Sequence, residues 1–186
     1  MRAFIAVDLA PEIKSAVEAL VRALRRKGGD VAWVKPEAMH LTLKFLGDIA
    51  AGRIPSLADR LRAVAAATRP FTLQVVGVGA FPNLAHPRAL WIGVAAPALR
   101  SLADAVEAAC VAEGFAAERR ALCPHVTLGR IRAHSRRGAP DLTLLTPDGG
   151  REFGVAPVES LVLFHSELRS EGARHTVLAT YPLAGG

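Results

Sequence analysis

Apolar residues recur along this chain with two different periods, and the two periods separate expected strands from expected helices. Short β-prone runs predict strands at residues 4–7, 31–34, 40–45, 71–78, 89–94, 125–130, 158–164 and 175–181, the last two as a hairpin. Apolar residues at helical spacing predict helices at residues 11–27, 54–64 and 97–110, and a proline opens the first and the third of them. Residues 132–150, richer in Arg, Gly, Pro and Asp, are expected to form a loop or a crossover.

The order strand, helix, strand occurs twice, in nearly equal steps. Val7 and Val94 lie 87 positions apart, the two helix-opening prolines 86, and His40 and His125 85. Equal steps of this kind are typical of an internal duplication, and two copies are too few for a solenoid. The sequence therefore predicts an α+β fold in which residues 1–186 form a single domain with two pseudo-symmetric lobes.

The last strand of each copy begins with the same kind of tetrapeptide. Residues 40–43 read His-Leu-Thr-Leu and residues 125–128 read His-Val-Thr-Leu, whereas chance predicts about 0.26 His-x-Thr occurrences for this many histidines and threonines. Side chains two apart on a strand share a face, so each strand presents one His and one Thr together and directs its apolar residues to the core.

Two such pairs around one small group would form a site for phosphodiester cleavage. Imidazoles, with a reference pKa near ~6.5, can hold opposite protonation states at neutral pH, so that one accepts a proton from water and the other protonates the departing oxygen. The hydroxyls of Thr42 and Thr127 can donate hydrogen bonds to phosphoryl oxygens. A zinc site is disfavoured, because the motif is His-x-Thr rather than His-x-His and no third ligand lies at a metal spacing.

Composition and charge restrict the class of protein, the kind of partner and the location that we expect. Of the 186 residues 51% are hydrophobic and 22% are charged, which excludes a disordered or disulfide-based protein. Lys and Arg number 23 against 17 acidic residues, and the abundance of Arg favours an anionic partner, although Arg-rich chains also arise from genome composition. No apolar run is long enough for a membrane span, and Asp8 interrupts the first apolar run too early for a signal peptide, so we expect a cytoplasmic protein.

The motifs and their surroundings resemble those of a known family. Beside the two tetrapeptides, the likeness rests on Phe4-Ile-Ala-Val, Lys44-Phe45-Leu46-Gly47, Leu90-Trp91-Ile92-Gly93, Cys123-Pro124 and the tail from Leu163 to Leu168. By these residues the chain is similar, over nearly its whole length, to the two-histidine (2H) phosphoesterases, and especially to the RNA 2′,3′-cyclic phosphodiesterases of the LigT/ThpR family. The resemblance implies antiparallel sheets that face a central cleft, with the helices outside.

The resemblance also implies roles for individual residues. His40 and His125 match the catalytic histidines of the family, and Thr42 and Thr127 match their phosphate-binding partners. In the family the second histidine activates water and the first protonates the leaving oxygen, so we assign His125 as base and His40 as acid, although the near symmetry of the motifs does not separate these roles. The expected activity is metal-independent hydrolysis of a 2′,3′-cyclic phosphate, on RNA or a small nucleotide, to a 2′-phosphomonoester, by a monomer without a cofactor.

Phe45 and Arg130 are further candidates for substrate contacts, Phe45 by stacking on a base and Arg130 by pairing with phosphate. Strict alternation opposes both, since it turns Lys44 to the cleft and Phe45 to the core, and turns Arg130 away from Thr127. A ligand role for either residue therefore requires the strand to end, bulge or twist just before it.

Other interpretations stay open at the level of the sequence. One alternative is a non-catalytic RNA-end-binding protein. Another is an enzyme that joins RNA ends by forming a 2′-5′ linkage from a cyclic phosphate and a 5′-hydroxyl. Trp33 and Trp91 are either core residues or platforms on which bases stack. His175, at a position where the family often carries Tyr, is expected to be structural.

Overall fold

The computed structural model describes residues 1–133, 136–143, 151–169 and 172–185. Its strands are β1 (Arg2–Asp8), β2 (Val31–Trp33), β3 (His40–Asp48), β4 (Phe71–Phe81), β5 (Ala89–Ala95), β6 (His125–Ile131), β7 (Glu152–Val158), β8 (Ser160–Arg169) and β9 (Gly172–Pro182). Its α-helices are α1 (Pro11–Arg26), α2 (Ile54–Ala67) and α3 (Pro97–Ala112), and the short 3-10 helices are η1 (Pro36–Ala38) and η2 (Ala51–Arg53).

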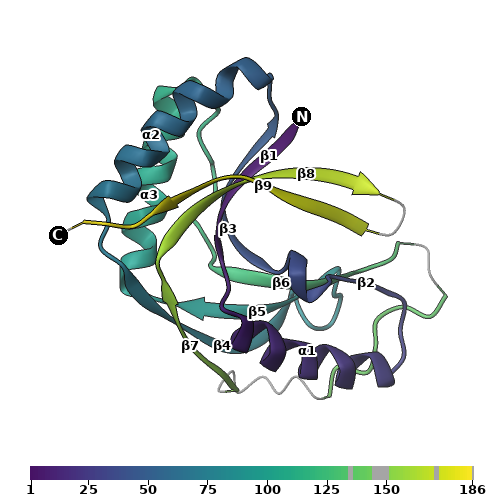
Figure 1. The fold of residues 1–186 in the computed structure, drawn as a ribbon. Helices are drawn as coiled ribbons and strands as arrows, with labels where there is room; N and C mark the ends of the chain where they lie inside the picture. The colour runs from purple at the N-terminus through teal and green to yellow at the C-terminus, as the bar shows by residue number, and fades with distance from the viewer. Residues whose placement is uncertain (134–135, 144–150, 170–171, 186) are drawn as a thin grey trace.

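In the described part of the chain the strands form two antiparallel sheets (Figure 1). The first sheet has the order β3-β1-β8-β9 and the second the order β2-β6-β5-β4-β7. Both sheets combine strands from distant parts of the chain, since β8 and β9 extend the sheet of β1 whereas β2 joins the sheet of β6. The pairing of β8 with β9 confirms the predicted C-terminal hairpin.

The helices pack on the outside of the sheets. Pro11 and Pro97 occupy the first helical positions of α1 and α3, where the missing N–H group is not needed. Helix α1 packs against β7, α3 packs against β3, and α2 lies beside α3 and contacts β9, as Figure 1 shows. Sheets with helices outside them confirm the predicted α+β fold. No helix of the described residues is long and apolar enough to span a membrane.

The sheets turn one face to a shared apolar core, and their other face lies outside this core. Residues from both sheets and from α1, α2 and α3 belong to this core, among them Ile5, Leu41, Leu61, Leu102 and Val126. Another, smaller cluster lies on the opposite face of the first sheet and consists of Phe4, Ala6, Val162 and Phe164. The ring of His40 stacks on Phe4 and therefore lies on this second face.

One strand at the edge of the second sheet was missed by the pattern of the sequence. β7 begins at Glu152, whereas the apolar pattern predicts a strand only from Val158 onward. Gly154 and Pro157 conceal the pattern, and Pro157 is tolerated because an edge strand does not need every N–H for pairing. The expected loop at 132–150 consists of turns and coil where it is described, and residues 134–135 and 144–150 lie outside the described residues.

The duplicated pattern reappears in the pairing of the strands that carry the two histidines. The paired residues are Ala6–Thr42 and Asp8–His40 in the first sheet, and Trp91–Thr127 and Gly93–His125 in the second. Each residue lies 85 positions before its counterpart. Val7 therefore corresponds to Ile92, and the 87-residue step to Val94 is not a structural equivalence.

Candidate active site

The strands that carry the two His-x-Thr motifs lie next to each other where the two sheets meet. β3 and β6 belong to different sheets, yet they are in contact. Val34, directly after β2, continues the pairing of β2 with β6, because its backbone N–H donates to the carbonyl oxygen of Leu128 at 2.8 Å. The His and Thr of each motif are half-buried, whereas Leu41 and Val126 between them are fully buried. Each strand thus presents its polar pair on the face opposite the core, as the alternation predicts.

The same local hydrogen bond orients both imidazole rings. Nδ1 of His40 donates to the carbonyl oxygen of Ala38 at 2.8 Å, and Nδ1 of His125 donates to that of Cys123 at 2.7 Å. Because a carbonyl oxygen can only accept, Nδ1 of each ring carries a proton. In the neutral ring Nε2 therefore has a free lone pair that can take up a proton, and in the charged ring the same atom can donate one.

A β-bulge in β3 overturns the predicted direction of the residues after Thr42. Consecutive residues of β1 pair with Thr42 and Lys44, so that Leu43 is an extra residue. The prediction that Lys44 faces the site and Phe45 the core is therefore wrong. Lys44 is 5% exposed on the core side, whereas Phe45 is 69% exposed and its ring lies 6.1 Å from that of Phe4.

β6 has the same bulge at the equivalent place. Consecutive residues of β5 pair with Thr127 and Gly129, which makes Leu128 the extra residue. Beyond the bulge, Arg130 returns to the face of Thr127 and is exposed, contrary to the strict alternation assumed from the sequence. Arg130 lies 85 positions after Phe45, so the two half-sites place these two candidates at equivalent positions.

The ring of His40 is packed among aromatic side chains. It stacks on Phe4 at a centroid distance of 4.5 Å, lies 5.8 Å from Phe164, and meets His175 edge to face at 5.0 Å. His175 also contacts Phe4 edge to face at 4.9 Å. His175 is expected from the sequence to be structural, and the structure places it directly beside the first catalytic candidate.

These surroundings make His40 a weak base in the free protein. Burial lowers the pKa of His40 to about 4, and repulsion from His175 and Lys14 adds to this effect, while the bond to Ala38 and the charge of Asp8 oppose it. Burial also lowers the pKa of His175. Both rings are therefore neutral at neutral pH when no anion is bound.

The ring of His125 has its own aromatic neighbours, and Trp91 is one of them. Phe81 meets His125 edge to face at 4.9 Å, and Trp91 lies 6.5 Å from His125 and 5.4 Å from Phe81. Trp91 thus lies on the site face. Trp33 is half-buried on the core side of the second sheet, close to Gly129, and the guanidinium of Arg25 lies 5.9 Å from the centre of its ring.

Sequence reasoning missed the aromatic residues around the histidines, namely Phe4, Phe81 and Phe164. A partial signal exists for Phe4, which lies two residues before Ala6, the partner of Thr42, and so shares its face. His175 carries no such local signal, because β9 reaches the site from 135 residues further along the chain. Within the described ranges no three His, Cys, Asp or Glu side chains are grouped as metal ligands.

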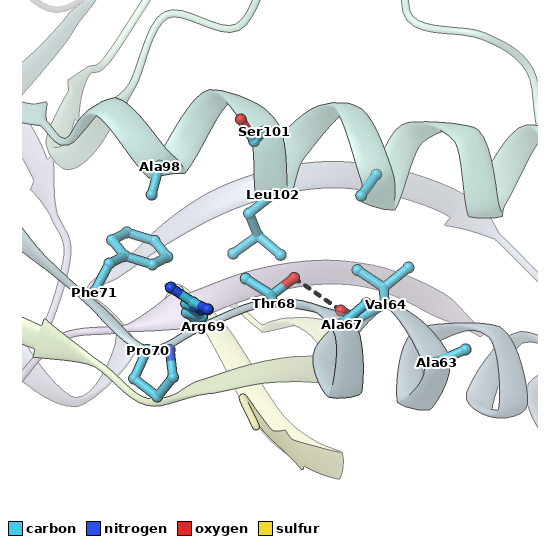
Figure 2. A pocket seen from close by; sticks show the side chains of 11 residues that line it. Ala63, Val64, Ala67, Thr68, Arg69, Pro70, Phe71, Ala98, Ser101 and Leu102 are labelled. Atoms are coloured by element: carbon cyan, nitrogen blue, oxygen red, sulfur yellow. Dashed lines mark hydrogen bonds between the residues drawn. The ribbon is translucent and has the colours of Figure 1, made fainter. Parts of the chain in front are cut away.

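An apolar groove of about 590 Å³ lies away from these strands, between α2 and α3 (Figure 2). Its walls include Val64, Leu102 and Phe71, and none of its lining residues belongs to β3 or β6. Thr68 uses its hydroxyl to bond the carbonyl oxygen of Val64 at 2.8 Å. The groove therefore offers no acid or base for the chemistry that the histidine strands support.

Comparison with known proteins places the chain in a family. The sequence profile described as LigT like Phosphoesterase matches it twice, at residues 7–91 and 92–174. The chain is 32% identical over 184 residues to an RNA 2′,3′-cyclic phosphodiesterase of Methanothermobacter thermautotrophicus, covering 98% of this chain and 99% of the relative. It is 33% identical over 190 residues to the protein of that name in Geobacillus stearothermophilus, covering 98% of this chain but only 57% of that longer relative.

Solved structures give the same result. The fold matches the crystal structure of TT0787 of Thermus thermophilus with a TM-score of 0.83 and 30% identity, over 100% of this chain and 99% of the other. It matches E. coli LigT complexed with 3′-AMP with a TM-score of 0.76 and 26% identity, over 98% and 97% of the two chains. Fold and paired motifs together define a two-histidine phosphoesterase. The chain belongs to the LigT like phosphoesterase family, which confirms the resemblance found in the sequence.

Proposed function

We propose that the protein hydrolyses the 2′,3′-cyclic phosphate at the end of an RNA, or on a small nucleotide, to a 2′-phosphomonoester without a metal ion. One observation carries the proposal: His40 and His125 are oriented alike by Nδ1–carbonyl bonds, on adjacent strands, each with a Thr two residues later on the same face. The family relatives named as RNA 2′,3′-cyclic phosphodiesterases support this substrate class.

The chemistry needs one proton acceptor and one proton donor. Nε2 of His125 takes a proton from water as the water oxygen forms a bond to phosphorus. The bond between phosphorus and O3′ breaks, its electron pair stays on O3′, and Nε2 of His40 supplies the proton that this oxygen needs. Thr42 and Thr127 donate hydrogen bonds to the non-bridging oxygens and stabilise the charge that develops there.

The lowered pKa of His40 is compatible with an acid role because the substrate is an anion. A negative charge beside an imidazole favours its protonated form, so a bound phosphate diester raises the pKa of His40 from about 4. The proton is thus held only while the substrate is present. His40 is therefore charged only in the complex with the substrate, where its proton is needed.

The two bulges support substrate contacts for Phe45 and Arg130. An exposed aromatic ring on the site face can stack on a nucleobase, which contributes about 1–3 kcal/mol in single-stranded nucleic acid binding. The guanidinium of Arg130 can pair with two phosphate oxygens at once. Both half-sites come from one chain, so we further propose that the protein acts as a monomer, and we place this activity in the cytoplasm.

The test is turnover of 2′,3′-cyclic AMP by His40→Ala and His125→Ala, with His86→Ala, an exposed histidine, as the matched control. Each site variant is expected to lose about 10² to 10⁴ in kcat, since each lacks its acid or its base, whereas the control keeps full activity. Chromatography of the product is expected to show 2′-AMP. Unchanged turnover in either site variant, or a 2′-5′ linked product, contradicts the proposal.

A diester with a p-nitrophenolate leaving group separates the two roles. This group leaves without help from an acid, so His40→Ala is expected to recover most of the lost rate on such a substrate, whereas His125→Ala is not. The opposite pattern would assign the base role to His40.

A further inference from the structure

Lys44 is buried and hydrogen-bonded directly beneath the site. Within the described ranges it is the only charged side chain that is buried. Its Nζ donates to Oε1 of Glu107 on α3 at 2.9 Å and to the carbonyl oxygen of Ala116 at 2.7 Å, and it forms an ion pair with Oε2 of Glu107 at 2.7 Å. The carboxylate of Glu107 is fixed in turn by the backbone N–H of Glu118 at 2.7 Å. The ammonium group is thus bonded both to α3 and to the segment that follows it.

The equivalent position in the other half carries glycine, and the sheet explains the difference. Gly129 lies 85 positions after Lys44, in a strand that has β2 on its outer side. A Cβ at Gly129 would lie 2.7 Å from a methyl group of Val31 and 3.1 Å from the carbonyl oxygen of Ala32. The neighbouring strand therefore covers and holds the bulge of β6.

β3 lacks such support, because it is the edge strand of the first sheet and no described strand pairs with its outer side. A bulge leaves one residue unpaired and disturbs the ladder around it. In β3 the residue directly after the bulge is the one that is bonded to α3 and to the segment that follows it. These side-chain bonds take the place that β2 occupies in the other half.

From this asymmetry we infer that Lys44 is a positioning residue, which holds the bulge of β3 and thereby directs Phe45 to the face of His40. Adjacent residues of a strand point to opposite faces. A backbone that directs Lys44 inward therefore also directs Phe45 outward. The inference rests on the proposed function, in which Phe45 contacts the nucleobase.

The variant that tests this inference must not leave a buried charge behind. Removing Lys44 while Glu107 stays would leave a carboxylate without its cation, which is destabilising for reasons unrelated to the bulge. The pair Lys44→Met with Glu107→Gln removes both charges and keeps an acceptor for the N–H of Glu118. Lys27→Met with Asp141→Asn is the matched control, because it makes the same changes in an exposed ion pair.

Two substrates separate positioning from general damage. One is 2′,3′-cyclic AMP, and the other is methyl riboside 2,3-cyclic phosphate, which has no base to stack. Phe45→Ala is expected to lower kcat/KM for the nucleotide about tenfold and to leave the riboside within about twofold. The Lys44/Glu107 double variant is expected to do the same, chiefly through KM, and to cause no further loss when combined with Phe45→Ala.

The outcomes decide the matter in either direction. Equal losses on both substrates, or losses that add to those of Phe45→Ala, overturn the positioning role while leaving the proposed function intact. A Phe45→Ala variant with normal kinetics overturns the inference together with the base contact, whereas loss of activity in His40→Ala still upholds the catalytic site. If the double variant does not fold, Lys44→Gln with Glu107→Gln, which also leaves no charge behind, is measured instead. A shift of about twofold or more in the ratio of the two kcat/KM values, in the same direction, supports the inference, and an unchanged ratio overturns it.

Discussion

Acidification is expected to destabilise this protein through His40. The pKa of an unfolded histidine is near ~6.5, and burial holds that of His40 in the folded protein at about 4. Between these pH values His40 is protonated in the unfolded chain but neutral in the folded protein. The free energy of unfolding therefore has its full value above about pH 6.5 and decreases as the pH falls toward 4. The loss amounts to about 2 kcal/mol at pH 5 and approaches about 3 kcal/mol below pH 4.

The measurement is urea unfolding of the wild type and of His40→Asn at pH values from 7 to 5. The free energy of unfolding of the wild type is expected to fall by about 2 kcal/mol more than that of His40→Asn over this range. His86→Asn removes an exposed imidazole and serves as the control. NMR titration of the free protein gives the pKa of His40 directly.

Two results would contradict this explanation of the acid sensitivity. If the ring of His40 titrates near 6.5 in the free protein, its aromatic surroundings do not exclude water as the structure indicates. If the wild type and His40→Asn lose equal stability on acidification, the pH dependence comes from other groups. Either result would also remove the need for the substrate to load His40 with its proton.

Three further predictions concern packing, metal ions and proton uptake. Gly129→Ala is expected to cost about 1–3 kcal/mol of stability in urea unfolding, because its Cβ would meet Val31 and Ala32. Gly52→Ala, which has open space around it, is the control, and equal stabilities of the two variants would contradict the packing. Turnover of 2′,3′-cyclic AMP is expected to be unchanged after dialysis against EDTA, and a loss restored by zinc would point to metal chemistry. Binding of inorganic phosphate near neutral pH is expected to take up protons, measured by calorimetry in two buffers, and an uptake of zero would contradict the acid role of His40.

The alternation of polar and apolar residues was sufficient to place the polar pairs. Leu41 and Val126 are buried and the flanking His and Thr are half-buried, because side-chain direction on a regular strand depends only on neighbours in sequence. The 85-residue step between the histidines likewise pointed to the equivalence of the two motifs, but the pairing of β1 and β5 was needed to show that Val7 corresponds to Ile92 and not to Val94.

The direction of Phe45 and Arg130 depends on contacts between strands. Alternation fails at Leu43 and Leu128, where neighbouring strands pair with one residue fewer, and a bulge depends on what the partner strand and the core require. No local pattern announces it. The burial of Lys44 belongs to the same class, since its partners lie 63 and 72 residues away along the chain.

The candidate groups of the site could be read from the sequence alone: two histidines, each with a threonine two residues later, in strands whose motifs lie 85 residues apart. Only the tertiary structure shows that the two histidines have different surroundings. His40 is surrounded by Phe4, Phe164 and His175, and His125 by Phe81 and Trp91. This difference arises because the identity of a titrating group is local, whereas its pKa depends on burial and on charges contributed by distant strands.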